Sequence, residues 1–249
     1  MKLLAALLVA FLALPVIALV VTGTPADFLA GLRDPLVLPA LGLSLFTTCV
    51  SLTAIVLLGT PLAWLLARNR FRAVEVIVQL PVVIPPAVAG LALLLAFGRR
   101  GLLGRAGLHV AFTTGAVVLA EIFVAAPFYV QAATAAFRRI DEELLIVARS
   151  LGARRFPAFV RVALPIARPA LVSGAAMAWA RALGEFGATL MFAGNLTGRT
   201  QTLPLAIYTL LESDLRAARS LSLVLVAAAF ALLFVVRSGS SLVFGGDRP

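Results

Sequence analysis

The amino-acid sequence predicts an all-α membrane protein, a polytopic bundle of about six transmembrane helices with a short polar cytoplasmic loop between the fourth and fifth spans. Of the 249 residues, 62% are hydrophobic and only 13% are charged. Several apolar runs exceed the roughly 18 to 20 residues that cross a hydrocarbon core. One long basic stretch, from Asp141 to Pro169, is too polar to lie in a bilayer, so the spans must flank it.

Residues 1–36 are expected to form a first transmembrane helix and an external loop. The apolar run 3–22 follows Lys2 and can be a signal peptide or a retained helix. It is long for a signal sequence and no Ala-x-Ala site follows it, which favours a retained helix with a kink near Pro15. The loop that follows contains Gly23 and Pro25.

A second apolar run, 37–67, ends at three closely spaced arginines, Arg68, Arg70 and Arg72, which are typical of a cytoplasmic edge. The third apolar region, 76–101, contains Pro81, Pro85 and Pro86 near its start. Because proline removes a helical hydrogen bond, we expect a broken helix that becomes regular at about Pro85 or Pro86. Such a break can border a cavity or a moving part, or it can be a kink absorbed by packing.

The remaining spans are expected at 114–136, 170–193 and 220–236, with a polar loop from Gly194 to about Arg219. Glu121 falls near the start of the fourth span and is expected at the membrane interface. Residues 237–249 would be a short cytoplasmic tail. In this topology, thirteen basic residues lie on the cytoplasmic side and seven outside, with Arg181 inside a span. The asymmetry predicts that both termini are cytoplasmic, although Arg99, Arg100 and Arg105 run against it.

The composition also excludes several functional classes. The net charge of +10 comes from arginines in short loops beside apolar runs, a pattern of membrane orientation and not of nucleic-acid binding. With one cysteine, Cys49, and one histidine, His109, we expect no disulfide framework, metal site or haem ligation. A phosphate loop of the form G-x-x-x-x-G-K-[ST] is absent, so the chain itself is not expected to hydrolyse ATP or to act as an enzyme.

The basic stretch has the pattern of two short helices joined by a glycine. Three acidic residues at 141–143 favour a helix N-terminus, and Gly152 is a natural helix stop because it tolerates positive φ. A second short helix, 154–162, would end at Leu164-Pro165 as the chain re-enters the membrane. Such a hairpin can be a docking surface for a protein, or it can rest on anionic lipid headgroups.

Here the sequence resembles the permeases of type I ABC importers, whose cytoplasmic loop carries E-A-A, three residues, G, nine residues and I-x-L-P. The resemblance implies that about 141–165 forms the coupling helices that sit in a groove of a separate ATPase. One departure is clear, because Ile146 and Val147 stand where the motif has Glu and its first Ala. The matching residues predicted to form this coupling loop are Ala148, Arg149, Ser150, Leu151, Gly152, Ala153, Val162, Leu164 and Pro165.

Residues 80–104 and 181–207 are similar to the molybdate branch of these permeases, whose near relatives carry tungstate, sulfate and thiosulfate. The resemblance covers about 37–236. It implies a homodimeric pore in the membrane lipid, a cytoplasmic ATPase dimer that holds the ATP and Mg²⁺, and an extracytoplasmic oxyanion-binding protein, with no cofactor in this chain. A sulfate or thiosulfate permease is an alternative, as is an ATPase-independent secondary transporter that uses Arg181 and Glu185.

A transported oxyanion needs hydrogen-bond donors that bind weakly enough to release it. Residues 189–202 are rich in Thr, Asn, Gln and Gly, and can line an outer gate or simply cap helices and turns. Arg181 and Glu185 are four residues apart, which predicts one helix face and favours a structural ion pair over direct anion contact. The candidate path and gate residues are Pro85, Pro86, Gly90, Glu185, Thr189, Asn195, Thr200 and Gln201.

Overall fold

The computed structural model describes residues 1–69 and 71–244, and within these ranges it contains helices and no strand. The long elements are α1 (Lys2–Val21), α3 (Val37–Arg68), α6 (Thr114–Arg138), α9 (Leu164–Leu183) and α12 (Leu215–Phe244). Between them lie α2 (Pro25–Gly31), α4 (Arg72–Val83), α5 (Pro86–Phe97), η1 (Gly104–Ala106), α7 (Glu142–Ser150), α8 (Arg155–Ala158), η2 (Phe159–Ala163), α10 (Gly187–Ala193) and α11 (Leu203–Ser213).

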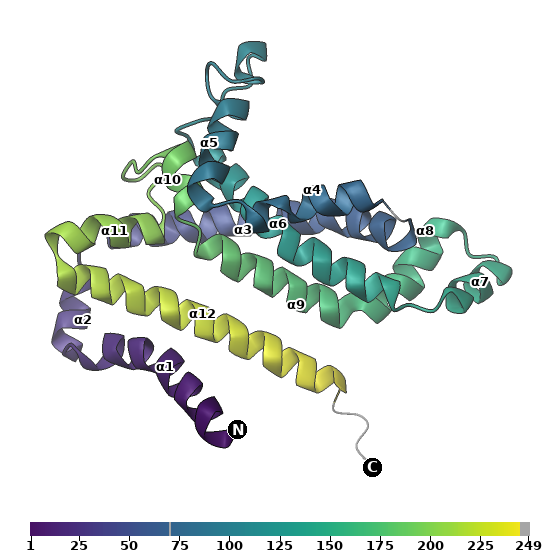
Figure 1. Ribbon diagram of the computed structural model, residues 1–249, viewed down its shortest axis with the longest axis horizontal. Coiled ribbons are helices and arrows are strands. Elements are labelled where there is room, and N and C mark those ends of the chain that lie inside the picture. The colour runs from purple at the N-terminus through teal and green to yellow at the C-terminus, as the bar shows by residue number, and fades with distance from the viewer. Residues whose placement is uncertain (70, 245–249) are drawn as a thin grey trace.

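The centre of the bundle is α6, which packs lengthwise against α3 and α9 (Figure 1). Small side chains make this close packing possible, as at Gly59, where an added Cβ would come within 2.9 Å of the Tyr129 ring. The Tyr129 hydroxyl lies 2.6 Å from Thr60 Oγ1, so the phenol is both packed and hydrogen-bonded. Towards one end of the core, Trp64 meets the edges of Phe137 and Phe159 at centroid distances of 5.3 and 4.9 Å. These aromatic contacts fix α3, α6 and η2, which leads into α9, relative to one another.

Four helical segments of the described chain are long and apolar enough to cross a membrane: α1, α3, α6 and the continuous segment Arg155–Leu183. The pair α4 and α5 qualifies as a fifth if it is counted as one bent span. The sequence-based number of six spans therefore stays a prediction. The limits of the last helix and of the loop before it were wrong. α11 and α12 occupy most of the predicted polar loop 194–219, and α12 continues past 236 to Phe244. Of the predicted tail 237–249, residues 245–249 lie outside the described ranges.

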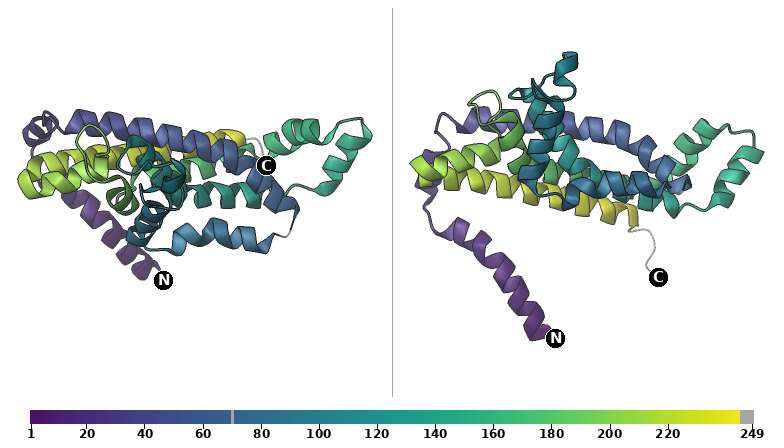
Figure 2. Two further views of the ribbon diagram at one scale, coloured as in Figure 1. Left: turned by 90° about the horizontal axis from the view of Figure 1, so that it is seen from above. Right: turned by 45° about the horizontal axis from the view of Figure 1, so that its top comes forward.

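The predicted break at the prolines is confirmed. α4 ends at Val83 and α5 begins at Pro86, and the two helix axes bend by 118°. Ile84 and Pro85 have ψ values of 130° and 140°, the extended conformation that a following proline imposes on the residue before it. As a result α5 leaves the bundle as an arm, which both views of Figure 2 show from other sides.

The helix α1 has no buried residue and lies apart from the core, in contact with α12 (Figures 1 and 2). It remains helical through Pro15. From its N-terminus it runs towards α2, at the end of the bundle opposite α7 and α8, and α12 returns in the other direction (Figure 1). The two long helices α1 and α12 therefore lie on the same side of the bundle, and their free ends point away from α2 (Figure 1).

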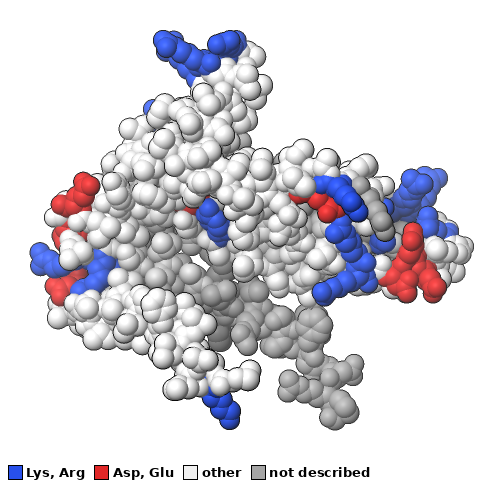
Figure 3. All heavy atoms as spheres, viewed as in Figure 1, with Lys and Arg blue, Asp and Glu red and all other residues white. Residues whose placement is uncertain are grey.

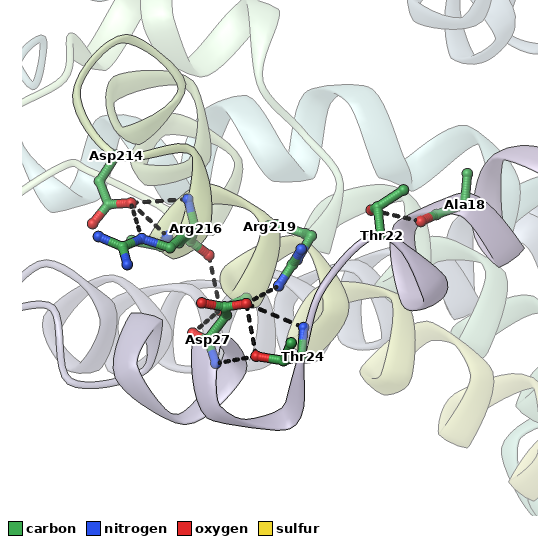
Figure 4. A network of polar contacts seen from close by, with 9 residues as sticks. Ala18, Thr22, Thr24, Asp27, Asp214, Arg216 and Arg219 are labelled. Atoms are coloured by element: carbon green, nitrogen blue, oxygen red, sulfur yellow. Dashed lines mark hydrogen bonds and ion pairs between the residues drawn. The ribbon is translucent and has the colours of Figure 1, made fainter.

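The junction of α2 and α12 is held by a polar clasp, shown in Figure 4. Thr24 caps α2 by accepting from the Asp27 amide at 3.1 Å, and its own hydroxyl donates to Asp27 Oδ2 at 2.7 Å. Arg219 of α12 reaches the same carboxylate at 4.0 Å. Asp214 caps the start of α12 by accepting from the Arg216 amide at 2.8 Å. Backbone amides at the start of α2 and of α12 are thus capped by nearby side chains, and the ion pair between Asp27 and Arg219 joins the two helices.

Candidate translocation gate and docking loop

The arm α5 packs against α10 at very short range. A Cβ added to Gly90 would lie 2.6 Å from Met191 Cβ and 2.8 Å from the Ala188 carbonyl oxygen. A Cβ on Gly187 would lie 2.6 Å from Pro86 Cβ. The two glycines let the helices touch almost backbone to backbone, so Pro86 and Gly90 of the predicted gate lie beside α10, the helix that carries Thr189. Pro85 caps α5 next to them and is exposed.

The fifth span is broken, which corrects the prediction of one helix over 170–193. α9 ends at Leu183 and α10 begins at Gly187. Glu185, between them, accepts from the Ala188 amide at 2.7 Å and pairs with Arg181 Nη1 at 2.6 Å. The predicted ion pair between Arg181 and Glu185 therefore exists, but it joins the last turn of α9 to the segment after the helix end and does not lie along one helix face. Both oxygens of this buried carboxylate are engaged, and this favours a structural role for Glu185.

Glu121 is buried between α6 and α3 with 2% of its surface exposed, and its depth at the membrane interface stays a prediction. Its carboxylate accepts from Thr47 Oγ1 at 2.8 Å and from Ser51 Oγ at 2.6 Å, both on α3. At this position α6 faces the polar side of α3.

That polar side of α3 was missed in the sequence. Ser44 accepts from the Leu203 amide at 2.7 Å, and Thr48 accepts from Trp179 Nε1 at 3.0 Å, so α3 is bound to α11 and α9 as well as to α6. The available signal was the spacing of Ser44, Thr47, Thr48 and Ser51, which puts four hydroxyls on one face of an otherwise apolar helix.

The predicted polar gate loop is folded onto α11. Asn195 Nδ2 and Gln201 Nε2 both donate to Thr209 Oγ1, at 2.9 and 3.2 Å. Thr200 Oγ1 accepts from the Leu196 amide at 2.9 Å. The hydroxyl of Thr189 is buried and has no hydrogen-bond partner among the described residues. Asn195 and Gln201 are therefore bound to α11, Thr200 is bound within the loop, and Thr189 on α10 retains a free hydroxyl among the described residues.

At the far end of the bundle, the basic stretch forms the two short helices that the sequence predicts. The Asp141 side chain accepts from the Glu143 amide at 3.0 Å at the start of α7. Gly152 has φ of +87°, and nothing lies within 4 Å of the place that a Cβ would take. The turn therefore requires glycine because of the positive φ, and not because a side chain would clash. The coupling-loop residues Ala148 to Leu151 end α7 and enter this turn, and Ala153 leaves it.

The second helix does not end at Leu164-Pro165, which corrects that prediction. α8 passes through η2 directly into α9, so Arg155–Leu183 is one continuous helical segment of 29 residues. Within η2, which has the wide turn of a π-helix, lies Val162, and Pro165 follows in the first turn of α9. A wide turn relieves the clash between a proline ring and the carbonyl four residues earlier, which is why the helix can continue.

The loop presents apolar side chains to solvent between its charges. Leu151 is 83% exposed and Phe156 74%, while Ile146, at the place of the motif's Glu, is half exposed. Figure 3 shows basic and acidic side chains gathered at this end of the molecule, beyond a mostly uncharged middle. Exposed apolar residues framed by charges are typical of a protein-docking surface.

Comparison with known families agrees with this architecture. Residues 55–243 match the family model described as "Binding-protein-dependent transport system inner membrane component". The chain belongs to this family of permeases. As an inner membrane component with several apolar helices, it is a multi-pass membrane protein.

Relatives of this permease span almost its whole length. It is 44% identical over 246 residues to the molybdenum transport system permease protein ModB of Mycobacterium bovis, covering 96% of this chain and 92% of the relative. It is 36% identical over 236 residues to the molybdate/tungstate transport system permease protein WtpB of Pyrococcus abyssi, covering 92% and 90%. The fold matches a bacterial alginate ABC transporter chain with a TM-score of 0.78 at 20% identity, over 97% of this chain and 93% of that one.

Proposed function

We propose that this chain is the membrane-spanning permease subunit of an ATP-driven importer of molybdate or the chemically equivalent tungstate. The observation that carries the proposal is the 44% identity, over 96% of the chain, to a permease named for molybdenum transport. The residues fit such a cargo. The gate region offers the Thr189 hydroxyl on α10, whereas its one buried carboxylate, Glu185, is neutralised by Arg181 and the α10 amide. Uncharged donors hold a dianion without trapping it.

In this proposal two copies of the chain form the pore, and each α7–α8 loop sits on a cytoplasmic ATPase subunit that carries the ATP and Mg²⁺. This chain contributes no catalytic residue. An extracytoplasmic binding protein delivers the oxyanion at the end formed by α2 and α11, with both termini of the chain on the cytoplasmic side. ATP-driven closure of the ATPase dimer moves the loops together and opens the cavity outward, and hydrolysis returns it to the inward-facing state.

The test is reconstitution of the chain in vesicles with its ATPase and binding protein, followed by assay of ATP hydrolysis. We expect hydrolysis to rise when the binding protein is loaded with molybdate or tungstate. A rise with sulfate alone would instead assign the chain to the sulfate branch. A stable permease that neither associates with the ATPase nor responds to any loaded binding protein would contradict the proposal and favour a secondary transporter.

A further inference from the structure

A polar groove runs along the bundle between α4 and α6, away from the predicted gate. Two adjoining cavities form it, of about 380 and 180 Å³, and both are lined by Leu66, Glu75 and Arg138. The larger opens at the cytoplasmic end of α3, and the smaller continues between α4 and α6. At about 30 Å³ per water molecule, even the smaller one holds several waters. No part of the gate or of the docking loop explains this groove.

The mouth of the groove is positively charged. Arg68, Arg72 and Arg138 line the larger cavity, and Glu75 is the one acidic residue among its lining side chains. Glu75 pairs with Arg138, which leaves two arginines without an ion pair among the described residues. Arg68 lies 4.6 Å over the Trp64 ring, and its Nε and Nη2 are buried without a hydrogen-bond partner in the part of the chain that the structure describes. Buried guanidinium donors that lack acceptors point to an anionic ligand.

Neutral donors continue the groove inward. The smaller cavity is lined by the amides of Gln79 and Gln131 and by the hydroxyl of Thr134. Thr134 is 6% exposed and its hydroxyl has no partner among the described residues. Gln131 lies seven residues before Arg138 on α6, or about 10 Å deeper along the helix axis. Exposed amides at that depth are costly against lipid tails, so this face of the bundle must line a wet path.

We propose that this groove is an inner site for a tetrahedral oxyanion on its way to the cytoplasm, bound by Arg72 and Arg68 at the mouth and by Gln79, Gln131 and Thr134 deeper in. The inference deepens the proposed function and rests on it for the identity of the cargo. The phosphate of an anionic lipid shares this chemistry and can bind basic pockets at the cytoplasmic side. An oxyanion is favoured over a lipid because hydrogen-bond donors continue inward from the arginines, among apolar side chains, to Gln79, Gln131 and Thr134.

The test uses cysteine accessibility in the complex of the permease with its ATPase, without nucleotide or binding protein. The one native cysteine, Cys49, is first replaced by serine. Gln131→Cys is then exposed from the cytoplasmic side to a water-soluble anionic methanethiosulfonate. We expect rapid labelling that molybdate slows and chloride does not. Ile77→Cys is the matched control on α4. Ile77 lies about 200° around the helix from Glu75 and lines neither cavity. Its side chain is 67% exposed on the face turned away from the groove, which we expect to meet lipid, so the water-soluble reagent should leave it unlabelled.

Arg72→Gln should raise the molybdate concentration that gives half protection about tenfold, as expected for loss of one charged hydrogen-bond donor. Arg139→Gln removes the same charge from the same end of the bundle but from a side chain outside the groove, and should leave that concentration unchanged. Gln79→Cys serves as a second reporter if Gln131→Cys does not assemble with the ATPase.

Three results would overturn the inference. The first is that the cysteine stays unlabelled at both reporter positions. The second is labelling that molybdate does not change. The third is slow labelling without molybdate in phosphatidylglycerol vesicles but not in phosphatidylcholine vesicles, because the anionic lipid itself then protects the cysteine. The last result would assign the groove to a lipid headgroup. Because the assay needs neither the binding protein nor ATP hydrolysis, it fails separately from the proposed function, which depends on stimulation of the ATPase by the loaded binding protein.

Discussion

At the scale of single residues, Gly152 shapes the turn of the docking loop and Glu121 joins α6 to α3. Gly152 has the positive φ that its place after an apolar helix predicted, because a helix stop is a local property of the backbone. The environment of Glu121 was not predictable in that way. Its burial depends on which face of α3 meets α6, and the carboxylate is accommodated only because Thr47 and Ser51 happen to face it.

Replacing Gly152 tests the turn of the docking loop. Gly152→Val should abolish association with the ATPase, because a β-branched residue is strained at φ of +87°, although nothing lies within 4 Å of its Cβ. Gly152→Asn should retain most association, since asparagine tolerates the left-handed region. Co-purification of the ATPase measures both. Equal association of the two variants would show that the turn geometry does not matter for docking.

Replacing Glu121 tests the buried contact between α3 and α6. Glu121→Leu should destabilise the protein by about 1–3 kcal/mol, because the hydroxyls of Thr47 and Ser51 lose their acceptor inside the bundle. Glu121→Gln keeps an acceptor oxygen and should cost much less. Thermal unfolding of the detergent-solubilised protein measures the difference. A Glu121→Leu variant as stable as the native chain would mean that the contact contributes nothing.

At the scale of elements, the two helix breaks differ in the same way. The break between α4 and α5 can be predicted from the sequence, because Pro85 and Pro86 each impose an extended backbone on the residue before them. The break between α9 and α10 carries no proline, and its Gly184, Glu185 and Gly187 lie between two apolar segments that together are long enough to read as one span. It exists because the Glu185 carboxylate caps α10 and holds Arg181, which are contacts that hydropathy does not record.

The contact between α5 and α10 can be tested with an added methyl group. Gly90→Ala should push the two helices apart, because the new Cβ would meet Met191 Cβ and the Ala188 carbonyl oxygen at 2.6 and 2.8 Å. We expect a several-fold loss of oxyanion uptake with the ATPase still bound. Gly42→Ala on α3 is the control, since its Cβ meets nothing within 4 Å. Normal uptake by Gly90→Ala would argue that the α5–α10 contact has no part in transport.

The clasp between α2 and α12 should depend on pH. The Thr24 hydroxyl and then the Thr24 amide, with weaker help from Arg219, hold the pKa of Asp27 below its ordinary value of 3.8. A carboxylate with a lowered folded-state pKa stabilises the fold above its unfolded-state pKa and loses that stabilisation as the pH falls through the folded-state pKa. Asp27→Asn should therefore be less stable than the native chain at neutral pH, with the gap closing below about pH 4.

Thermal unfolding of both proteins across that pH range measures the gap. Glu212→Gln is the control, because it removes a carboxylate from the same end of the molecule and Glu212 makes no ion pair among the described residues. A gap between Asp27→Asn and the native chain that stays constant down to strongly acidic pH would contradict the assignment.

At the scale of the whole molecule, composition was enough to predict a helical membrane bundle with a polar helical hairpin at one end, because a long basic stretch cannot lie among apolar spans. Figure 3 shows charged side chains collected mainly at the two ends of the bundle and at the tip of the α5 arm. The groove between α4 and α6 was not predicted. Its lining residues come from α3, α4 and α6, and only packing brings Arg68, Gln79 and Gln131 to one surface.

The predicted topology can be tested with reporters fused near the two ends of the chain. The C-terminal end of α12 points towards the same end of the bundle as α7 and α8 (Figure 1), and the positive charges predict that this end is cytoplasmic. Reporters at Lys2 and after α12 should both be active only in the cytoplasm, and one in the α2 region only outside it. Activity of the two terminal reporters on opposite sides would exclude an even number of spans.

The unbroken helix from Arg155 to Leu183 has a mechanical consequence. Its 29 residues are about 43 Å long, and it carries the docking surface at one end and the start of the gate region at the other. In the proposed transport cycle, a continuous helical segment of that length would work as a lever arm. A tilt of about 10° at the ATPase displaces the far end by about 7 Å, more than one helical turn of about 5.4 Å. The turn at Gly152 lies outside this segment, so in the proposed transport cycle a small movement of the docking loop becomes a larger displacement beside Glu185.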